Sequence, residues 1–214
     1  MGVENEVRAR CARSARSGMG EAAGERKRGR PTEAERALRH DRILDEALAL
    51  FASRGYGAVT IDELALSAQV TKRTIYAYFG DKAGVFTAVI ERFRAQAGVL
   101  SGAGVLETAT RIVEVLFSDS AVAMHRLMIA EAQQFPELAA SFYDSGPRGY
   151  IDLLAAGLPA GSSESERAAL AEALFGLLLG EPHRRRLLGL SDAPSRAAAR
   201  AHVASALALL RLGE

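Results

Sequence analysis

The chain has 214 residues, of which 49% are hydrophobic and 25% are charged, and its formal net charge is +1. This length and composition predict a soluble globular protein that is large enough for one small and one medium domain. The longest uncharged stretch, residues 95–106, is short and contains three glycines, so no segment is suited to span a membrane. Apolar and polar residues nowhere alternate for long enough to indicate a half-buried strand, and the predicted fold class is therefore all-α.

The first residues and the cysteine content exclude several further classes. Residues 1–20 carry both signs of charge and no apolar core, which argues against a secretory signal, so the expected location is cytoplasmic. Cys11 is the one cysteine of the sequence, which rules out an internal disulfide and a metal site built from cysteines. We interpret Cys11 as an inert thiol in a polar leader, with a redox-sensing thiol as the alternative.

The charges are unevenly distributed along the chain. Residues 1–94 contain 17 Lys and Arg against 13 Asp and Glu (+4), and residues 95–214 contain 10 against 13 (−3), which together give +1. The positive excess of the N-terminal half agrees with nucleic-acid binding there, although ordinary domains show excesses of this size.

Residues 1–31 are predicted to be a disordered leader that ends in a basic arm. No periodicity is visible up to about residue 25. The arm follows as RKRGRP at residues 26–31, where the glycine and the proline favour an extended backbone. Arg28 and Arg30 are candidates for contacts in the narrow, electronegative minor groove of DNA. The alternative interpretation is a solvated basic tail.

A helix is predicted from Thr32 to about Arg54. Thr32 is followed three residues later by Glu35, which is the spacing of a capping box. Gly55 then ends the helix. The apolar face expected to be buried consists of Ile43, Ala47, Leu50 and Phe51.

The stretch at residues 60–82, TIDELALSAQVTKRTIYAYFGDK, predicts two short helices joined by a tight turn. Thr60 is a candidate N-cap of the first helix, and Thr71 is a candidate N-cap of the second, residues 72–79. About eight residues at 1.5 Å rise make a rod of roughly 12 Å, which fits the major groove of DNA. The second helix is expected to bury Ile75 and Phe79 and to leave cations and hydroxyls on its other faces: Lys72, Arg73, Thr74, Tyr76 and Tyr78.

The residues from Ile43 to Phe86 resemble the DNA-binding domain of the TetR family of transcriptional regulators. The resemblance includes the run Thr74-Ile75-Tyr76-x-Tyr78-Phe79 and the pair Asp81-Lys82. It implies a head of three helices in which Lys72, Arg73 and Thr74 approach base edges. It also implies contacts to DNA phosphates from Thr60, Tyr76, Tyr78 and Lys82. The arm at residues 26–31 is likewise similar to the arms of many family members and to the core of AT-hooks.

Two residues depart from the family pattern. Gln69 stands where the family often has a turn glycine, which is tolerable if its backbone avoids a positive φ. Arg73 replaces a common glycine of the recognition helix and adds a long donor that can read guanine or hold a phosphate. The operator sequence of another family member is therefore not expected to apply to this chain.

After a DNA-binding domain at residues 32–80, residues 81–214 are predicted to form a helical effector-binding and dimerisation domain. Asp81 caps a helix from Lys82 to about residue 100, and further helices are expected at residues 106–117, 122–134 and 136–158. The last of these is expected to kink or break at Gly146-Pro147. Two terminal helices follow, one at residues 164–188 and one from Pro194 onward.

The stretch from Leu127 to Pro147 resembles the effector domain of the AefR-like branch of the family, which implies an effector pocket without naming its ligand. Methionine and aromatic side chains suit an uncharged or weakly polar molecule, but they also occur in a hydrophobic core that binds no ligand. His125 has no second His or Cys at ligand spacing, so no metal site is predicted. The candidate lining residues are Met124, His125, Met128, Phe142, Tyr143 and Tyr150, with Arg111, Arg126 and Arg148 as alternatives for an anion.

The amphipathic terminal helices predict a symmetric four-helix dimer interface, with packing inside one protomer as the alternative. The run of arginines at residues 184–186 is interpreted as the solvated last turn of a helix rather than a second DNA site. The interface candidates are Leu170, Leu174, Leu177, Leu178, Val203, Leu207 and Leu210.

These features predict a sequence-specific DNA-binding regulator: a homodimeric repressor released from a near-palindromic operator by a small-molecule effector. Repression is implied by the resemblance rather than by any residue. The alternative is a helical adaptor without sequence-specific DNA binding. An enzyme is not expected, because no glycine-rich phosphate loop follows a strand and the four histidines are scattered. No cofactor is predicted, and the sequence identifies neither the operator, nor the effector, nor the target genes.

Overall fold

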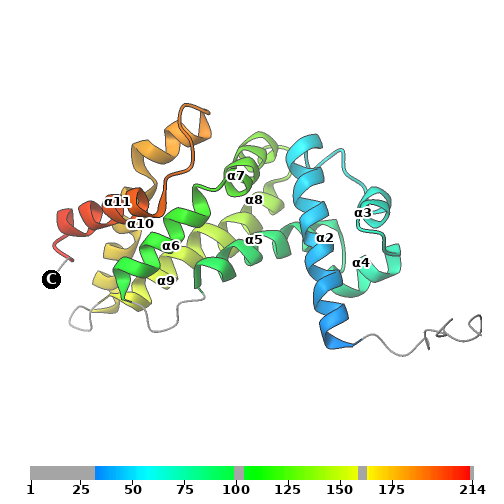
Figure 1. The fold of residues 1–214 in the computed structure, drawn as a ribbon, viewed down its shortest axis with the longest axis horizontal. Coiled ribbons are helices and arrows are strands. Elements are labelled where there is room, and N and C mark those ends of the chain that lie inside the picture. Colours follow the sequence, from blue (N-terminus) through cyan, green and yellow to red (C-terminus); the bar gives the residue numbers. More distant parts are fainter. Residues whose placement is uncertain (1–31, 99–103, 159–162, 213–214) are drawn as a thin grey trace, which may run out of the picture. The chain divides into compact units, whose positions relative to one another are not determined.

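The computed structural model describes residues 32–98, 104–158 and 163–212. Every regular element in these three ranges is helical, which confirms the predicted all-α class (Figure 1). The described residues from Ala37 onward belong to one compact unit. The element labels below are those of Figure 1.

The first three described helices form the predicted head. They are α2 (Glu33–Arg54), α3 (Ile61–Ser67) and α4 (Lys72–Phe79). The Thr32 amide donates to the Glu35 carboxylate at 2.8 Å and the Thr32 hydroxyl accepts from the Glu35 amide at 3.2 Å, so α2 begins with the expected capping box. The head closes on a core of fully buried side chains: Ile43, Leu44, Ala47, Phe51, Leu64 and Ile75.

The turn between α3 and α4 differs from the expectation for Gln69. Its φ is 54°, so the backbone does not avoid the left-handed region and a side chain occupies a conformation that glycine adopts freely. The turn still closes, because the Val70 amide donates to the Ala65 carbonyl at 2.9 Å. The packing of α3 and α4 around Gln69 therefore offsets the strain of its left-handed backbone.

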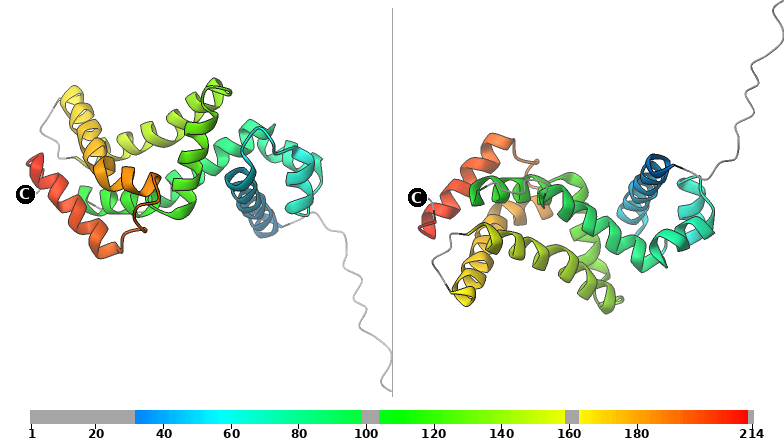
Figure 2. Two further views of the ribbon diagram at one scale, coloured as in Figure 1. Left: turned by 90° about the horizontal axis from the view of Figure 1, so that it is seen from above. Right: turned by 90° about the horizontal axis from the view of Figure 1, so that it is seen from below.

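The remaining helices are shorter or shifted by a few residues relative to the predicted ranges. They are α5 (Lys82–Gly98), α6 (Val105–Leu116), α7 (Asp119–Glu131), α8 (Pro136–Tyr143), α9 (Gly149–Gly157), α10 (Glu164–Leu187) and α11 (Arg196–Leu209). In Figure 2, α11 lies along α6, while α10 packs against α9. The domain limits predicted at residues 80 and 81 coincide with the loop between α4 and α5, and they stay a prediction.

Between α8 and α9 the chain does not break at Gly146-Pro147. The residues Asp144–Arg148 form a π-helical turn, η1, that carries the helix through Pro147. A proline has no N–H to donate, and the wider turn accommodates both this loss and its ring. Gly146 is buried there, and a Cβ at this position would lie 3.2 Å from the Ile90 side chain.

Helix α10 is not continuous. Gly180 has φ 33° and ψ −147°, and Pro182 follows, so two helical segments meet at a kink. Such a backbone conformation is open to glycine and strained for other residues. The kink redirects the second segment, which contains His183.

The three arginines of that segment have different roles, which corrects the interpretation of a solvated helix end. Arg184 and Arg185 are exposed, whereas Arg186 is 6% exposed. The Arg186 guanidinium donates twice to the Phe117 carbonyl at 3.1 Å, donates once to the Ser191 carbonyl at 2.8 Å and lies 2.5 Å from the Asp119 carboxylate. Arg186 therefore ties α10 to the segments that follow α6 and precede α11.

Candidate DNA-binding surface and apolar cavity

The exposed side of α4 carries the predicted DNA-contacting side chains. Lys72, Arg73 and Tyr76 are exposed, whereas Thr74 and Tyr78 are half-buried. Ile75 on the opposite side is fully buried and anchors the helix in the head. Arg73 makes no ion pair within the described ranges of the chain, so its guanidinium is available to a base edge or a phosphate.

Two threonines position the helix termini of this surface. The Thr71 hydroxyl accepts from the Thr74 amide at 3.2 Å and lies 2.9 Å from the Thr74 hydroxyl. The Thr60 hydroxyl accepts from the Glu63 amide at 3.2 Å, and the Thr60 amide donates to the Glu63 carboxylate at 2.9 Å. Both threonines therefore act as N-caps. They keep the first turns of α3 and α4 ordered where these turns face solvent.

Lys72 is paired with a carboxylate that the sequence-based interpretation did not include. Its ammonium forms an ion pair with Asp62 of α3, and this hydrogen bond raises the pKa of Lys72. Both side chains are more than half exposed, so the pair is solvated and readily exchanged for another partner. A DNA phosphate or base at this position must compete with Asp62.

Lys82 lies at the start of α5 and contacts the segment between α2 and α3. Its ammonium donates to the Tyr56 carbonyl at 2.8 Å and to the Val59 carbonyl at 2.9 Å, and it lies 4.2 Å from the centroid of the Tyr56 ring. Burial lowers its pKa. Two of its three protons are therefore engaged inside the protein, which leaves one for a phosphate.

The predicted arm residues Arg28 and Arg30 lie outside the described residues. Their proposed contact with the minor groove remains a prediction.

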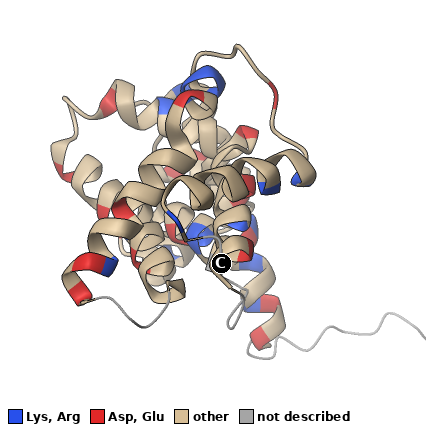
Figure 3. Ribbon diagram, turned by 90° about the vertical axis from the view of Figure 1, so that its left-hand side faces the viewer, with Lys and Arg blue, Asp and Glu red and all other residues tan. Residues whose placement is uncertain are grey.

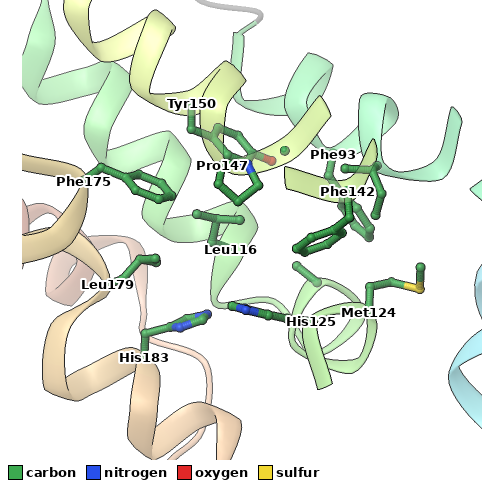
Figure 4. Close-up of a pocket in the computed structure, with 13 residues that line it drawn as sticks. Phe93, Leu116, Met124, His125, Phe142, Pro147, Tyr150, Phe175, Leu179 and His183 are labelled. Carbon is green, nitrogen blue, oxygen red and sulfur yellow. The ribbon is translucent and has the colours of Figure 1, made fainter. Parts of the chain in front are cut away.

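An enclosed, mostly apolar cavity lies between the helices that follow the head (Figure 4). Its volume is about 40 Å³, which is room for only a few water molecules. The lining includes no Lys, Arg, Asp or Glu among the residues that the structure describes. The lining residues are Ile90, Phe93, Leu116, Ala121, Met124, His125, Phe142, Gly146, Pro147, Tyr150, Phe175, Leu179 and His183.

Four of the predicted pocket residues meet at this cavity and two do not. Met124, His125, Phe142 and Tyr150 line it. Met128 is buried away from the lining, and Tyr143 is 49% exposed because it lies on the outer side of α8. Arg126, an alternative for an anion, instead donates to the backbone carbonyls of Arg186 and Leu187 at 2.8 and 2.7 Å and caps the end of α10.

Sequence reasoning missed the contribution of α10, above all His183. The His183 ring lies 5.3 Å from the His125 ring, centroid to centroid, although 58 residues separate them in sequence. Burial lowers the pKa of both rings, that of His183 to about 4 with a further contribution from the nearby His125. No local pattern marks this pair, because only the packing of α7 on α10 creates it.

The structure places most of the predicted dimer residues inside the protomer. Leu174, Leu178, Val203 and Leu207 are at most 3% exposed, because they pack on helices of the same chain. Leu170 and Leu210 are partly buried against the same core, and Leu177 is 36% exposed. The exposed positions of these helices include the leucines Leu177 and Leu209, charged residues such as Glu172 and Arg200, and a set of small residues: Ala169, Ala173 and Gly176 on α10, and Ala197, Ala201, Ala204 and Ala208 on α11.

The described residues contain neither a membrane-spanning helix nor a cluster of metal ligands. None of the helices there combines the length and the apolar character needed to cross a bilayer. No cluster of three or more His, Cys, Asp or Glu suited to a metal ion occurs in residues 32–98, 104–158 and 163–212.

A three-helix head with a capped helix-turn-helix and an exposed, cationic second helix defines a DNA-binding protein. Residues 43–89 match the family described as bacterial regulatory proteins, tetR family, and residues 103–211 match the AefR-like transcriptional repressor, C-terminal domain. The chain belongs to the TetR family of transcriptional regulators. These regulators are non-enzymatic DNA-binding proteins, so the assignment confirms that the chain is not an enzyme.

Solved structures with similar folds come from the same family. A TetR-family regulator from Mesorhizobium loti has 26% sequence identity and a TM-score of 0.62, and the similarity covers 84% of this chain and 98% of that one. The flavonoid-responsive regulator FrrA has 26% identity and a TM-score of 0.59, with coverage of 81% of this chain and 95% of that one.

Curated relatives match over a short part of the chain. The HTH-type transcriptional repressor SCO4008 of Streptomyces coelicolor is 41% identical over 51 residues, which are 24% of this chain and 27% of the relative. The biofilm operon regulator IcaR of Staphylococcus aureus, a negative regulator, is 35% identical over 46 residues, which are 22% of this chain and 25% of the relative. The chain thus spans about a quarter of the length of these relatives.

Proposed function

We propose that the chain is a homodimeric repressor that occludes promoter DNA and is released from a near-palindromic operator by a small-molecule effector. The observation that supports this most directly is that one chain combines an exposed, cationic α4 with an enclosed apolar cavity in its second half. Repression is favoured because the matched curated relatives are repressors. The site of action is the cytoplasm, where the operator DNA is found.

The proposed DNA contacts divide into two kinds. Lys72, Arg73 and Thr74 read base edges in the major groove, and Thr60, Tyr76, Tyr78 and Lys82 hold phosphates. Two heads related by a two-fold axis place their recognition helices about 34 Å apart, or a multiple of this distance, and so read a near-palindrome. Arg28 and Arg30 add minor-groove contacts at the flanks.

Specific DNA binding is tested with promoter fragments. We expect gel shifts with the DNA upstream of the chain's own gene or its neighbours, and we expect Arg73→Ala to relax preference at one base pair per half-site by about 1 to 3 kcal/mol. Lys82→Ala should instead weaken binding to all sequences equally. A folded protein that shifts no promoter fragment would support the adaptor alternative.

The dimer surface proposed here is the face of small residues on α10 and α11, since the apolar stripe of both helices is used inside the protomer. A side chain at Gly176 would meet no atom within 4 Å, so this position is open. Small side chains permit close approach of helices from a second copy. In Figure 3, which views the molecule from the side of the C-terminus, long uncharged tan stretches run between the blue and red segments.

The dimer is tested by placing charges on this face. Ala173→Glu combined with Ala201→Glu should give monomers in sedimentation, because carboxylates would be buried at a two-fold interface without partners. Ala140→Glu, at an exposed position of α8, is the control and should leave the dimer intact. A wild-type chain that is monomeric at micromolar concentration would contradict the dimer.

Effector binding can reach the head through α7. This helix contributes Met124 and His125 to the cavity, and the Glu131 carboxylate at its end accepts from the Tyr56 amide at 3.1 Å, in the segment that joins α2 to α3. The Phe135 ring packs edge-on against the Tyr56 ring, 5.1 Å away. A shift of α7 therefore moves the connection between the helices of the head.

An effector must bind one conformation of the protein better than the other, and the small volume of the cavity provides this difference in affinity. Pockets for drug-sized ligands measure roughly 300–1,000 Å³, so an effector has to enlarge a cavity of about 40 Å³. A ligand shifts a conformational equilibrium only if it binds one state better, and a ligand that requires the enlarged cavity meets this condition.

The effector response is tested by titrating apolar, polyphenolic and anionic compounds against the preformed DNA complex and following DNA release. Flavonoids belong in this panel because FrrA, to which the chain is similar, is described as flavonoid-responsive. Ala121→Leu fills the cavity without changing a polar group and should abolish the response while operator binding remains. Release by small anions alone, unaffected by Ala121→Leu, would contradict the apolar effector site.

A further inference from the structure

The polar groups of the cavity are concentrated at two places. The imidazoles of His125 on α7 and His183 on α10 lie side by side, and the ring of Tyr150 on α9 lies on the other side of the lining (Figure 4). Everything else in the lining is apolar or glycine. A ligand of this cavity can therefore form directional contacts at two ends and apolar contacts between them.

The two imidazoles form part of a longer row of rings. His125 lies 5.7 Å from Phe142, and His183 lies 5.1 Å from Phe117, centroid to centroid. At the other end, the Tyr150 ring is stacked on Phe175 at 6.3 Å with an interplanar angle of 14°. All of these rings except Phe117 line the cavity. Flat aromatic molecules pack well against such walls, because offset and edge-on ring contacts stabilise them beyond simple burial.

The hydrogen-bonding state of the imidazoles follows from their burial. Desolvation lowers the pKa of both rings, so both are neutral at pH 7. A neutral imidazole has one donor and one acceptor nitrogen. His183 uses its N–H for the Leu116 carbonyl, which leaves its second nitrogen as an acceptor.

Neither of the two cations that act on these rings lies in the lining of the cavity. Arg186, the cation that influences His183, is occupied by the Phe117 and Ser191 carbonyls and by Asp119. Arg94, the cation that influences Tyr150, does not belong to the lining. Binding a carboxylate among neutral imidazoles would require the simultaneous uptake of a proton, whereas a neutral hydroxyl needs none.

We propose that the effector is a neutral, flat aromatic molecule with hydroxyl groups at both ends, one of which donates to the His125–His183 pair while the other accepts from the Tyr150 hydroxyl. This inference rests on the proposed effector site and names the class of its ligand, a polyphenol. Burial raises the pKa of Tyr150 and keeps its hydroxyl protonated as a donor.

The proposal is tested with four probes on one ring system: naphthalene, 2-naphthol, 2,6-dihydroxynaphthalene and 2-naphthoate. Affinities for the full-length wild-type protein are measured by calorimetry at several pH values between 5.5 and 8. We expect 2-naphthol to bind about 10-fold tighter than naphthalene, because one well-placed hydrogen bond is worth roughly that factor, and the second hydroxyl to add a further gain. Between pH 7 and 8, above the usual pKa of histidine, affinity for both phenols should not depend on pH.

Substitutions test which residue provides the gain in affinity from each hydroxyl. His183→Leu and His125→Leu should each bring the ratio of 2-naphthol affinity to naphthalene affinity close to one, and Tyr150→Phe should remove the gain from the second hydroxyl. His202→Leu is the matched control, because His202 contacts the Leu178 carbonyl at 2.9 Å and lies outside the lining. If His183→Leu does not fold, His125→Leu carries the test alone.

Two results would overturn the proposal. Equal binding of naphthalene and 2-naphthol would show that the imidazoles recognise no hydroxyl. Tightest binding of 2-naphthoate, with affinity rising as the pH falls, would show that they protonate to hold an anion. Failure of the proposed function gives a different pattern: histidine-dependent binding of the phenols to the free protein without DNA release supports the ligand class and contradicts effector-induced release.

Discussion

Replacing Arg186 by methionine tests the buried guanidinium that joins α10 to its neighbours. Methionine retains an unbranched apolar side chain but provides no donor, so the Phe117 and Ser191 carbonyls lose their partners. A buried acceptor left without a partner costs about 1 to 3 kcal/mol, whereas the Asp119 carboxylate, which is 94% exposed, is resolvated at little cost. We expect the free energy of unfolding to fall by about 3 kcal/mol, in the lower half of the roughly 2 to 6 kcal/mol for two carbonyls, because Ser191 is only half-buried.

The measurement is denaturant and thermal unfolding followed by circular dichroism. For a chain of this size a loss of about 3 kcal/mol lowers Tm by roughly 6–12 °C. Arg185→Met is the matched control, since it makes the same change one residue away at an exposed position and should alter stability by less than about 0.5 kcal/mol. Arg186→Lys should fall between the two, because an ammonium lacks the planar fork that serves both carbonyls.

If Arg186→Met and Arg185→Met unfold at the same denaturant concentration, the buried guanidinium contributes nothing and the reasoning is refuted. A destabilised Arg186→Met chain should in addition dimerise more weakly, because Arg186 also holds the segment that leads into α11. Sedimentation of the variant at a temperature where it is still folded measures this second effect.

Three further predictions concern single side chains. Gln69→Gly should raise the free energy of unfolding by about 1 kcal/mol because it removes a side chain from a left-handed backbone, and Gln69→Ala should give no such gain in the same thermal melts. Asp62→Asn should free Lys72 from its ion pair and increase the affinity for DNA of any sequence. The salt dependence of DNA binding should become steeper by about one charge. Salt titrations with non-operator DNA that show an unchanged slope would exclude this. Between pH 6.5 and about 4 the wild type should lose stability as the pH falls, because the unfolded chain binds a proton that buried His183 does not, and His183→Gln should lose less; identical slopes in both proteins would contradict it.

The helices of the head could be predicted closely because their signals are local. The capping boxes at Thr32 and Thr60 and the cap at Thr71 each involve residues three positions apart, and all three are present. A recognition helix with cations on its outer side follows from the same few residues. Gln69 shows the limit of such signals, since the expected avoidance of a positive φ does not occur and tertiary packing imposes the turn.

Periodicity revealed apolar stripes on the terminal helices but not what covers them. The stripe through Leu174 and Leu178 was expected at a dimer interface, and the structure shows that helices of the same chain bury it. An apolar stripe indicates only that this face of the helix is shielded from water. A neighbouring helix of the same chain and a second copy of the chain shield it equally well. The surface proposed for a second copy contains mainly alanines and a glycine, which carry no strong hydrophobic signal, and Leu177 and Leu209 are exposed on the same two helices.

By itself the sequence determined that the described residues are helical, which residues cap the helices of the head, and which side of α4 faces solvent, because caps and 3.6-residue periodicity act within a few turns of the chain. The tertiary structure alone decided that Arg186 is buried while Arg185 is exposed, and that His125 meets His183 in a cavity with Tyr150. These contacts join helices far apart in sequence, and their geometry depends on how α7, α9 and α10 pack around the kink at Gly180 and Pro182.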